Sequence, residues 1–132
     1  MQTENVINHI VDWLKDYATN ARVKGFVVGI SGGIDSAVTS TLCAKTGLDV
    51  LCIEMPIHQA ESHVSRAQEH IAQLKKQYSN VQDTKTDLTP VFDEFTTEVS
   101  LEGKEDTVNM ALANTRARLR MTTLYYLSLI HI

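Results

Sequence analysis

Residues Gly25 to Ser36 read GFVVGISGGIDS, and this stretch decides the fold. Its first half, Gly25 to Ile30, is a short apolar run rich in β-branched residues that is too short to be a buried helix. Such a run, closed by turn residues, predicts a fully buried strand. The chain turns helical from Asp35 onward, so Gly32 and Gly33 are expected at a turn between a strand and a helix.

The same alternation continues on both sides of this turn. Apolar residues at three- and four-residue steps, from Ile7 to Tyr17, predict an amphipathic helix before the strand. The helix that follows the turn should end near Gly47, a natural C-terminal cap. A second buried strand is expected over 50–55, then a helix over about 64–78, and 81–86 has the composition of a third strand.

The last third of the chain is predicted to be helical. Pro90 fits the first turn of a short helix capped by Asp87 or Thr89. Residues 97–106 are polar and are expected to form a loop, and a long uninterrupted helix should begin near Thr107. Strands that alternate with helices predict an α/β fold with a parallel β-sheet flanked by helices, in which ligands bind beyond the carboxyl ends of the strands.

Size and composition indicate one soluble globular domain. The chain has 132 residues, of which 43% are hydrophobic and 21% are charged. No apolar run approaches the roughly 20 residues of a membrane span, and the N-terminus lacks the features of a secretory signal, so we expect a cytoplasmic protein without a membrane partner. Three strands make only half of a typical sheet of this class, and the tail at 128–132 lacks a cap, which suggests a truncated chain.

Charge and cysteine usage narrow the function further. The net charge is −4, and the only tight basic cluster is Arg116, Arg118 and Arg120, which argues against a nucleic-acid partner. Cys43 and Cys52 lie in apolar surroundings within a predicted helix and a predicted strand. We expect both to be buried, reduced thiols without a catalytic role.

The turn SGGIDS has the features of a phosphate-binding loop. Gly32 and Gly33 allow positive φ angles and a close approach of the backbone to an anion, while the following helix offers free N–H groups and the positive end of its dipole. Ser31 and Ser36 add hydroxyl donors, and Asp35 is best explained as a ligand of a phosphate-bound magnesium ion. The alternative is an ordinary tight turn in which Asp35 and Ser36 only cap the helix.

Two other glycine-rich loops are excluded by spacing. The sequence has no G-x-x-x-x-G-K-[ST] pattern, and its glycines do not follow G-x-G-x-x-G. A Walker-type phosphate site and a dinucleotide-binding turn are therefore not expected.

Three histidines and two aromatic residues are further candidates for site residues. His58, His63 and His70 lack the i, i+4 spacing of helical metal ligands, and we expect them to face solvent. Trp13 and Tyr17 on the first helix are interpreted as packing residues and not as a platform for a base.

Two motifs resemble those of a known family. S-G-G-x-D-S after a strand resembles the signature of the pyrophosphate-loop ATPases, which cleave ATP between the α and β phosphates. Residues 114–121, NTRARLRM, resemble the N-x-x-A-R-x-R-M stretch of ammonia-dependent NAD synthetases. The N-terminal helix and the strand GFVVGI also resemble that family, so the resemblance covers about 6–127, roughly the first half of its catalytic domain.

This resemblance implies a fold, a reaction and partners. The fold would be an incomplete adenine nucleotide α-hydrolase-like (Rossmann-like) three-layer α/β/α domain spanning 1–132. The reaction would be NAD biosynthesis by ATP-dependent amidation of deamido-NAD with ammonia, through an adenylate, with ATP and Mg²⁺ required and no general base. A homodimer through the first and last long helices is also implied.

The resemblance also assigns site residues. Asp35 would bind magnesium and Arg118 would contact deamido-NAD, whereas Arg116 and Arg120, which share another helix face, are expected in salt bridges. The ATP phosphates would be bound by Gly29, Ile30, Ser31, Gly32, Gly33, Ile34, Asp35 and Ser36.

Two segments differ from the family pattern. Glu54-Met55-Pro56 stands where many members carry Arg-Leu-Pro, which puts the adenine contacts of this segment in question, and the tail after Leu127 does not resemble the family's continuation. Alternatives are another pyrophosphate-loop ATPase, such as a GMP synthetase domain or a tRNA-modifying enzyme, and a non-catalytic nucleotide-binding fragment.

Overall fold

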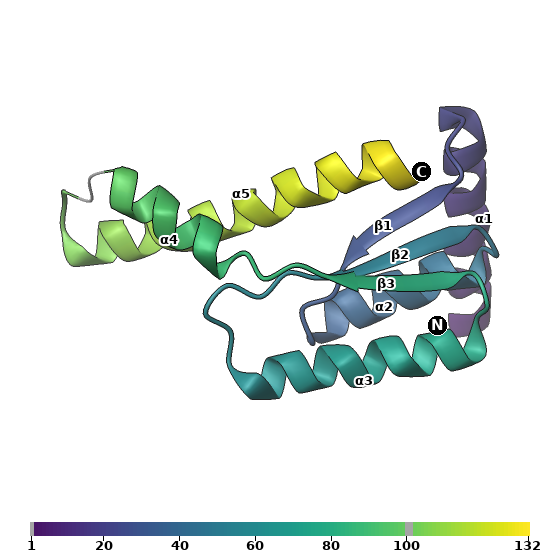
Figure 1. Ribbon diagram of the computed structural model, residues 1–132. Helices are drawn as coiled ribbons and strands as arrows, with labels where there is room; N and C mark the ends of the chain where they lie inside the picture. The colour runs from purple at the N-terminus through teal and green to yellow at the C-terminus, as the bar shows by residue number, and fades with distance from the viewer. Residues whose placement is uncertain (1, 100–101) are drawn as a thin grey trace.

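A three-stranded parallel sheet forms the centre of the molecule, in the order β1-β2-β3 (Figure 1). The computed structural model describes residues 2–99 and 102–132. The strands are β1 (Gly25–Gly29), β2 (Asp49–Glu54) and β3 (Val81–Lys85). The sheet is parallel and has helices on both faces, so the predicted α/β class is confirmed.

Five helices surround this sheet. They are α1 (Thr3–Ala21), α2 (Ile34–Lys45), α3 (Glu61–Gln77), α4 (Thr89–Glu98) and α5 (Glu105–His131). The loop predicted over 97–106 is shorter than expected, because α4 continues to Glu98 and α5 already begins at Glu105. Residues 100–101 of that predicted loop lie outside the described residues.

The two faces of the sheet are covered by different helices, which gives three layers. On one face, α2 and α3 contribute Cys43, Ala44, Ala67, Ile71 and Leu74 to a core cluster, with α1 packed against α2. On the other face, α4 and α5 cover residues such as Leu51 and Ile53 of β2. Figure 1 shows α5 running along this second face, opposite α2 and α3.

The carboxyl ends of the strands lie at one edge of the sheet. Beyond β1, the amide of Ile30 donates to the carbonyl of Ile53 at 2.8 Å, and beyond β3 the amide of Thr86 donates to the carbonyl of Glu54 at 2.9 Å. These bonds extend the pairing by one residue on each side of β2. The turn after β1 and the loop after β2 therefore leave the sheet next to one another.

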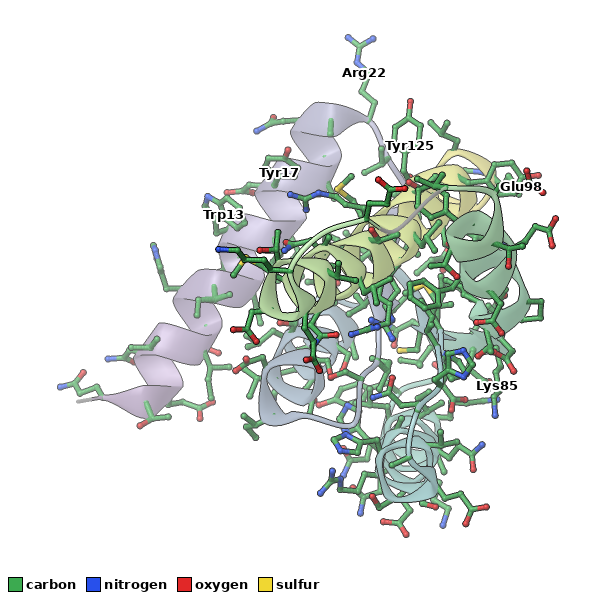
Figure 2. All side chains as sticks on the ribbon, turned by 90° about the vertical axis from the view of Figure 1, so that its left-hand side faces the viewer. Trp13, Tyr17, Arg22, Lys85, Glu98 and Tyr125 are labelled. Atoms are coloured by element: carbon green, nitrogen blue, oxygen red, sulfur yellow. The ribbon has the colours of Figure 1, made fainter. Side chains whose placement is uncertain are left out.

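The solvent-facing surfaces of α1 and α5 carry several large apolar side chains. Tyr17, predicted on the buried face of the first helix, is 60% exposed, and Val11 and Ala18 face the core instead. Trp13, which is 57% exposed, stacks against Tyr17 with ring centroids 5.4 Å apart (Figure 2). No residue of α5 is fully buried.

The cysteines are placed as predicted. Cys43 and Cys52 are buried free thiols on α2 and β2. Burial raises the pKa of each to about 11. Among the described residues, no helix is both long and apolar enough to cross a membrane.

Candidate phosphate-binding loop and adjoining cavity

The turn between β1 and α2 has the backbone of an anion-binding loop. Gly32 adopts a left-handed φ of 83°, and Gly33 is the extended N-cap residue from which α2 begins. The first-turn amides of a helix have no partners within the helix, and they carry the positive end of its dipole. The loop therefore presents N–H groups at the carboxyl edge of the sheet.

Two serines close this loop. The hydroxyl of Ser36 lies 3.1 Å from that of Ser31 and donates to the carbonyl of Gly33 at 3.1 Å. The amide of Ser31 donates to Ser36 Oγ, and the amide of Gly33 donates to Ser31 Oγ, both at 3.2 Å. The serines expected to donate to a phosphate thus fix the shape of the turn in this structure.

The glycine at position 32 is required by packing as well as by conformation. A Cβ atom at Gly32 would lie 2.5 Å from the carbonyl oxygen of His63 on α3. A positive φ is in addition costly for residues that have a side chain. Any substitution at Gly32 must therefore displace either the turn or α3.

Asp35 lies in the first turn of α2 with an exposed side chain. Within residues 2–99 and 102–132, no three His, Cys, Asp or Glu side chains gather as a metal site. A single carboxylate is nevertheless enough for magnesium, because this ion is usually held by one or two carboxylates together with substrate phosphates and water. The site thus fits an ion that arrives with a nucleotide.

A cavity of about 320 Å³ opens beside the loop. It lies at the carboxyl ends of β1 and β2, between α3 and α5. Its walls are mostly apolar, with polar groups at Ser31, Glu54, Gln59, His63 and Arg120. Apolar walls and a few fixed polar groups are typical of small-molecule sites.

Arg120 connects α5 to the loop that follows β2. Its Nε donates to the carbonyl oxygen of Met55 at 2.9 Å, and its Nη2 donates to Gln59 Oε1 at 3.1 Å. Burial, with a contribution from the like charge of Arg116, lowers the pKa of Arg120. Its guanidinium lines the cavity and fixes one side of it.

The outer side of the same loop is attached to α4. His58, which has a left-handed φ of 49°, places its Nε2 2.6 Å from Asp93 Oδ1, and its amide donates to Thr89 Oγ1 at 3.1 Å. The His58 ring also contacts the Phe92 ring edge-on, and the guanidinium of Arg116 lies over the Phe92 ring, 5.4 Å from its centroid. The loop is therefore held between α4 and α5.

The three arginines differ from the expectation in part. Arg118 is exposed and does not line the cavity. Salt bridges were predicted for Arg116 and Arg120, and this prediction is wrong: neither forms an ion pair with a carboxylate among the described residues. Sequence reasoning missed Arg120 as a cavity residue, because the four-residue spacing shows that Arg116 and Arg120 share a helix face but not what that face contacts.

Glu54 is the charged residue most deeply buried in the cavity wall. The residue is 7% exposed and ends β2. Burial raises the pKa of its carboxyl group, the nearby charge of Asp83 acts in the same direction, and Lys85 opposes it. Nothing in the local sequence pattern signalled this environment beyond the position of Glu54 at the end of an apolar strand.

The expectation of solvent-facing histidines holds for two of the three. His58 and His63 are exposed, but His70 is half-buried and its Nε2 lies 2.8 Å from Ser40 Oγ. Ser40 Oγ also lies 2.8 Å from the carbonyl oxygen of Ser36, so the Ser40 hydroxyl connects α2 to His70 on α3. Burial lowers the pKa of His70.

Comparisons with known proteins agree with this geometry. The sequence profile of the family described as NAD synthase matches residues 6–131. The chain is 36% identical over 129 residues to an NH(3)-dependent NAD(+) synthetase from Finegoldia magna, covering 96% of this chain and 49% of that protein. It is 35% identical to the enzyme of the same name from Methanosarcina mazei, covering 96% and 48%.

Solved structures show the same arrangement. The NMN synthetase from Francisella tularensis superimposes with a TM-score of 0.88 at 29% identity, covering 99% of this chain and 52% of that one. The NH3-dependent NAD synthetase from Campylobacter jejuni gives 0.84 at 27% identity, covering 98% and 53%. The chain spans about half the length of the relatives it matches. Because the family profile extends over nearly the whole chain, this protein belongs to the NAD synthase family.

Proposed function

We propose that this chain supplies the ATP-binding half of an ammonia-dependent NAD synthetase. The observation that carries the proposal is the Gly29–Ser36 turn, whose left-handed Gly32 and free helix N-terminus lie beside the cavity. The phosphates of ATP would bind at the turn, and its nucleoside would lie in the cavity. Asp35 would hold magnesium against the phosphates.

The reaction would proceed in two displacements. A carboxylate oxygen of deamido-NAD attacks the α-phosphorus of ATP, forming an adenylate and releasing pyrophosphate. Ammonia then attacks the activated acyl carbon, and AMP leaves as the C–N bond forms. The first step needs two anions aligned and their charge neutralised, which loop amides provide without a general base.

Arg118 is proposed to contact deamido-NAD. Its side chain is exposed and does not line the cavity, so the contact would be made at a surface of α5 and not inside this cavity. A homodimer through α1 and α5 would bring that surface into an enclosed site. The exposed apolar residues of these two helices support such a dimer: Trp13, Tyr17, Met110, Met121, Tyr125, Tyr126, Leu129 and Ile130.

The dimer can be tested with a matched pair of substitutions. Met121 on α5 is 54% exposed, and Val91 on α4 is 52% exposed. Met121→Asp should shift the sedimentation of the full-length protein toward the monomer, because it places a charge in the proposed interface. Val91→Asp should not. Equal sedimentation of both variants and the unmodified protein would contradict an interface on α5.

The related NMN synthetase supports a second candidate substrate. Its structure matches this chain at 29% identity, so amidation of nicotinate mononucleotide, a mononucleotide in place of a dinucleotide, must be tested in parallel. The chemistry at the ATP site would be the same.

One assay tests these proposals together. Pyrophosphate release is measured for this chain and for the full-length gene product with ATP, magnesium and ammonia, adding either deamido-NAD or nicotinate mononucleotide. Release that depends on one of them and is lost in Asp35→Ala supports a synthetase and identifies its substrate. ATP binding without release by the full-length protein would instead favour a non-catalytic nucleotide-binding role.

A further inference from the structure

Glu54 faces the α3 side of the sheet. Side chains alternate along a strand, so Glu54 shares a face with Cys52, which packs with Ala67 and Ile71 of α3. The cavity is lined on this side by Val64 and Ala67 together with Glu54. The carboxyl group thus lies in an apolar part of the wall, near the turn after β1.

The carboxylate of Glu54 has no hydrogen-bond partner among the described residues. In the same part of the chain, every polar side-chain atom that is sealed from solvent does have a partner. The oxygens of Glu54 are therefore not sealed, although the residue is only 7% exposed. The space that they reach is the cavity that the residue lines.

Two charged residues of β3 influence this carboxylate, and neither forms an ion pair with it. Lys85 is opposite Glu54 in the register of β2 and β3, but the two side chains are not within ion-pair distance, and Lys85 extends outward (Figure 2). Asp83, which carries a like charge, pairs with Lys75. The carboxylate therefore faces the cavity without a partner in the described part of the chain, where a hydrogen-bond donor of a bound ligand can reach it.

We propose that Glu54 accepts a hydrogen bond from a neutral donor of the nucleoside bound in the cavity, either the exocyclic amine of the base or a ribose hydroxyl. The inference rests on the proposed function, which places a nucleotide there. A carboxylate repels phosphate and repels the carbonyl of a 6-oxopurine, whereas it accepts from an amine or a hydroxyl. Glu54 is thereby a specificity-determining residue of the nucleotide site.

The test compares four nucleotides in the full-length gene product. ATP, ITP, 2′-deoxy-ATP and 3′-deoxy-ATP are titrated calorimetrically into the unmodified protein, Glu54→Gln and the control Glu61→Gln. Glu61 is an exposed carboxylate at the start of α3 and does not line the cavity. Titrations are made at pH 8, because burial raises the pKa of Glu54 and only the ionised group is a pure acceptor.

A charge-assisted hydrogen bond predicts a loss of ATP affinity of about tenfold to a hundredfold in Glu54→Gln, and little change in Glu61→Gln. The analogue that lacks the donor should already bind weakly to the unmodified protein and should lose little more in the variant. Weak binding of ITP to the unmodified protein would identify the exocyclic amine as the donor. Weak binding of one deoxynucleotide would identify the corresponding ribose hydroxyl.

Two results would overturn the proposal. One is equal affinity of the unmodified protein for all four nucleotides. This measurement needs no variant, so it decides the question even if Glu54→Gln fails to fold. The other is a Glu54→Gln variant whose affinity for every nucleotide is unchanged or reduced by one common factor. If ATP binds, and Asp35→Ala weakens ATP binding while Glu54→Gln has no effect on it, only this inference fails. If ATP does not bind to the unmodified protein at all, the proposed function fails.

Discussion

Arg120 on α5 donates its Nε–H to the carbonyl oxygen of Met55, a residue 65 positions earlier in the chain, at 2.9 Å. This bond joins the helix on one face of the sheet to the loop that leaves β2. It is reinforced by the bond from Nη2 to Gln59. One side chain therefore determines where that edge of the cavity lies.

Removing this connection should loosen the cavity. Arg120→Met keeps much of the aliphatic side chain but leaves the Met55 carbonyl without its partner, so we expect unfolding free energy to fall by about 1–3 kcal/mol and ATP to bind more weakly. Chemical denaturation and calorimetric titration measure the two effects. The control is Arg118→Met on the exposed side of α5, which should change neither stability nor ATP affinity.

Gly32→Ala should destabilise the protein more than Gly33→Ala. At Gly32 a side chain meets both a left-handed φ of 83° and the carbonyl of His63, whereas at Gly33 the φ is −92° and the nearest contact is Ser31 Oγ at 3.3 Å. The strained backbone alone costs about 1–3 kcal/mol. Thermal unfolding of both variants checks this order, and equal melting temperatures would contradict it.

His70 should make stability depend on pH. Its pKa is lowered from the ordinary value of 6.5, so the unfolded chain binds more protons than the folded protein between the lowered value and 6.5. Stability then rises with pH across that window and is lost as the pH falls through it. His70→Gln should flatten the slope of melting temperature between pH 7 and 5, while His9→Gln, on the exposed surface of α1, should not.

The two cysteines should resist alkylation while the protein is folded. With the pKa of both raised to about 11, little thiolate exists at pH 8, and both sulfurs are buried. Iodoacetamide at pH 8 should therefore leave Cys43 and Cys52 unmodified, as measured by mass spectrometry, and should label both in denaturant. Rapid labelling of the native protein would show that the α2 side of the core opens readily.

The local structure could be predicted because its determinants are local. The apolar run GFVVGI, the pair Gly32-Gly33 and the helical periodicity around Ile71 each specify one element from a few neighbouring residues. The strand edges and most helix ends fell within a few residues of expectation. The geometry of the turn between β1 and α2 could likewise be predicted, because it needs only a strand, two glycines and a helix in sequence order; phosphate binding at this turn stays a prediction.

The cavity could not be predicted in the same way, because it is formed by residues distant in sequence. The bonds from Arg120 to the loop after β2, and from His58 to Asp93, depend on how α4 and α5 pack on the sheet. A periodic pattern shows that Arg116 and Arg120 share a face but not what that face meets. Tyr17 was misplaced for a related reason, since its helix buries only a narrow stripe at Val11 and Ala18.

The distribution of the site along the chain has a consequence for biosynthesis. The strand and turn that hold Gly32 are synthesised early, while Arg120 and Leu124, which close the cavity, follow about 90 residues later. At ordinary translation rates the ribosome needs roughly 5 to 20 seconds to cover that distance. During that interval the nascent chain carries the turn with one wall of the cavity missing, so the cavity is completed only when α5 emerges.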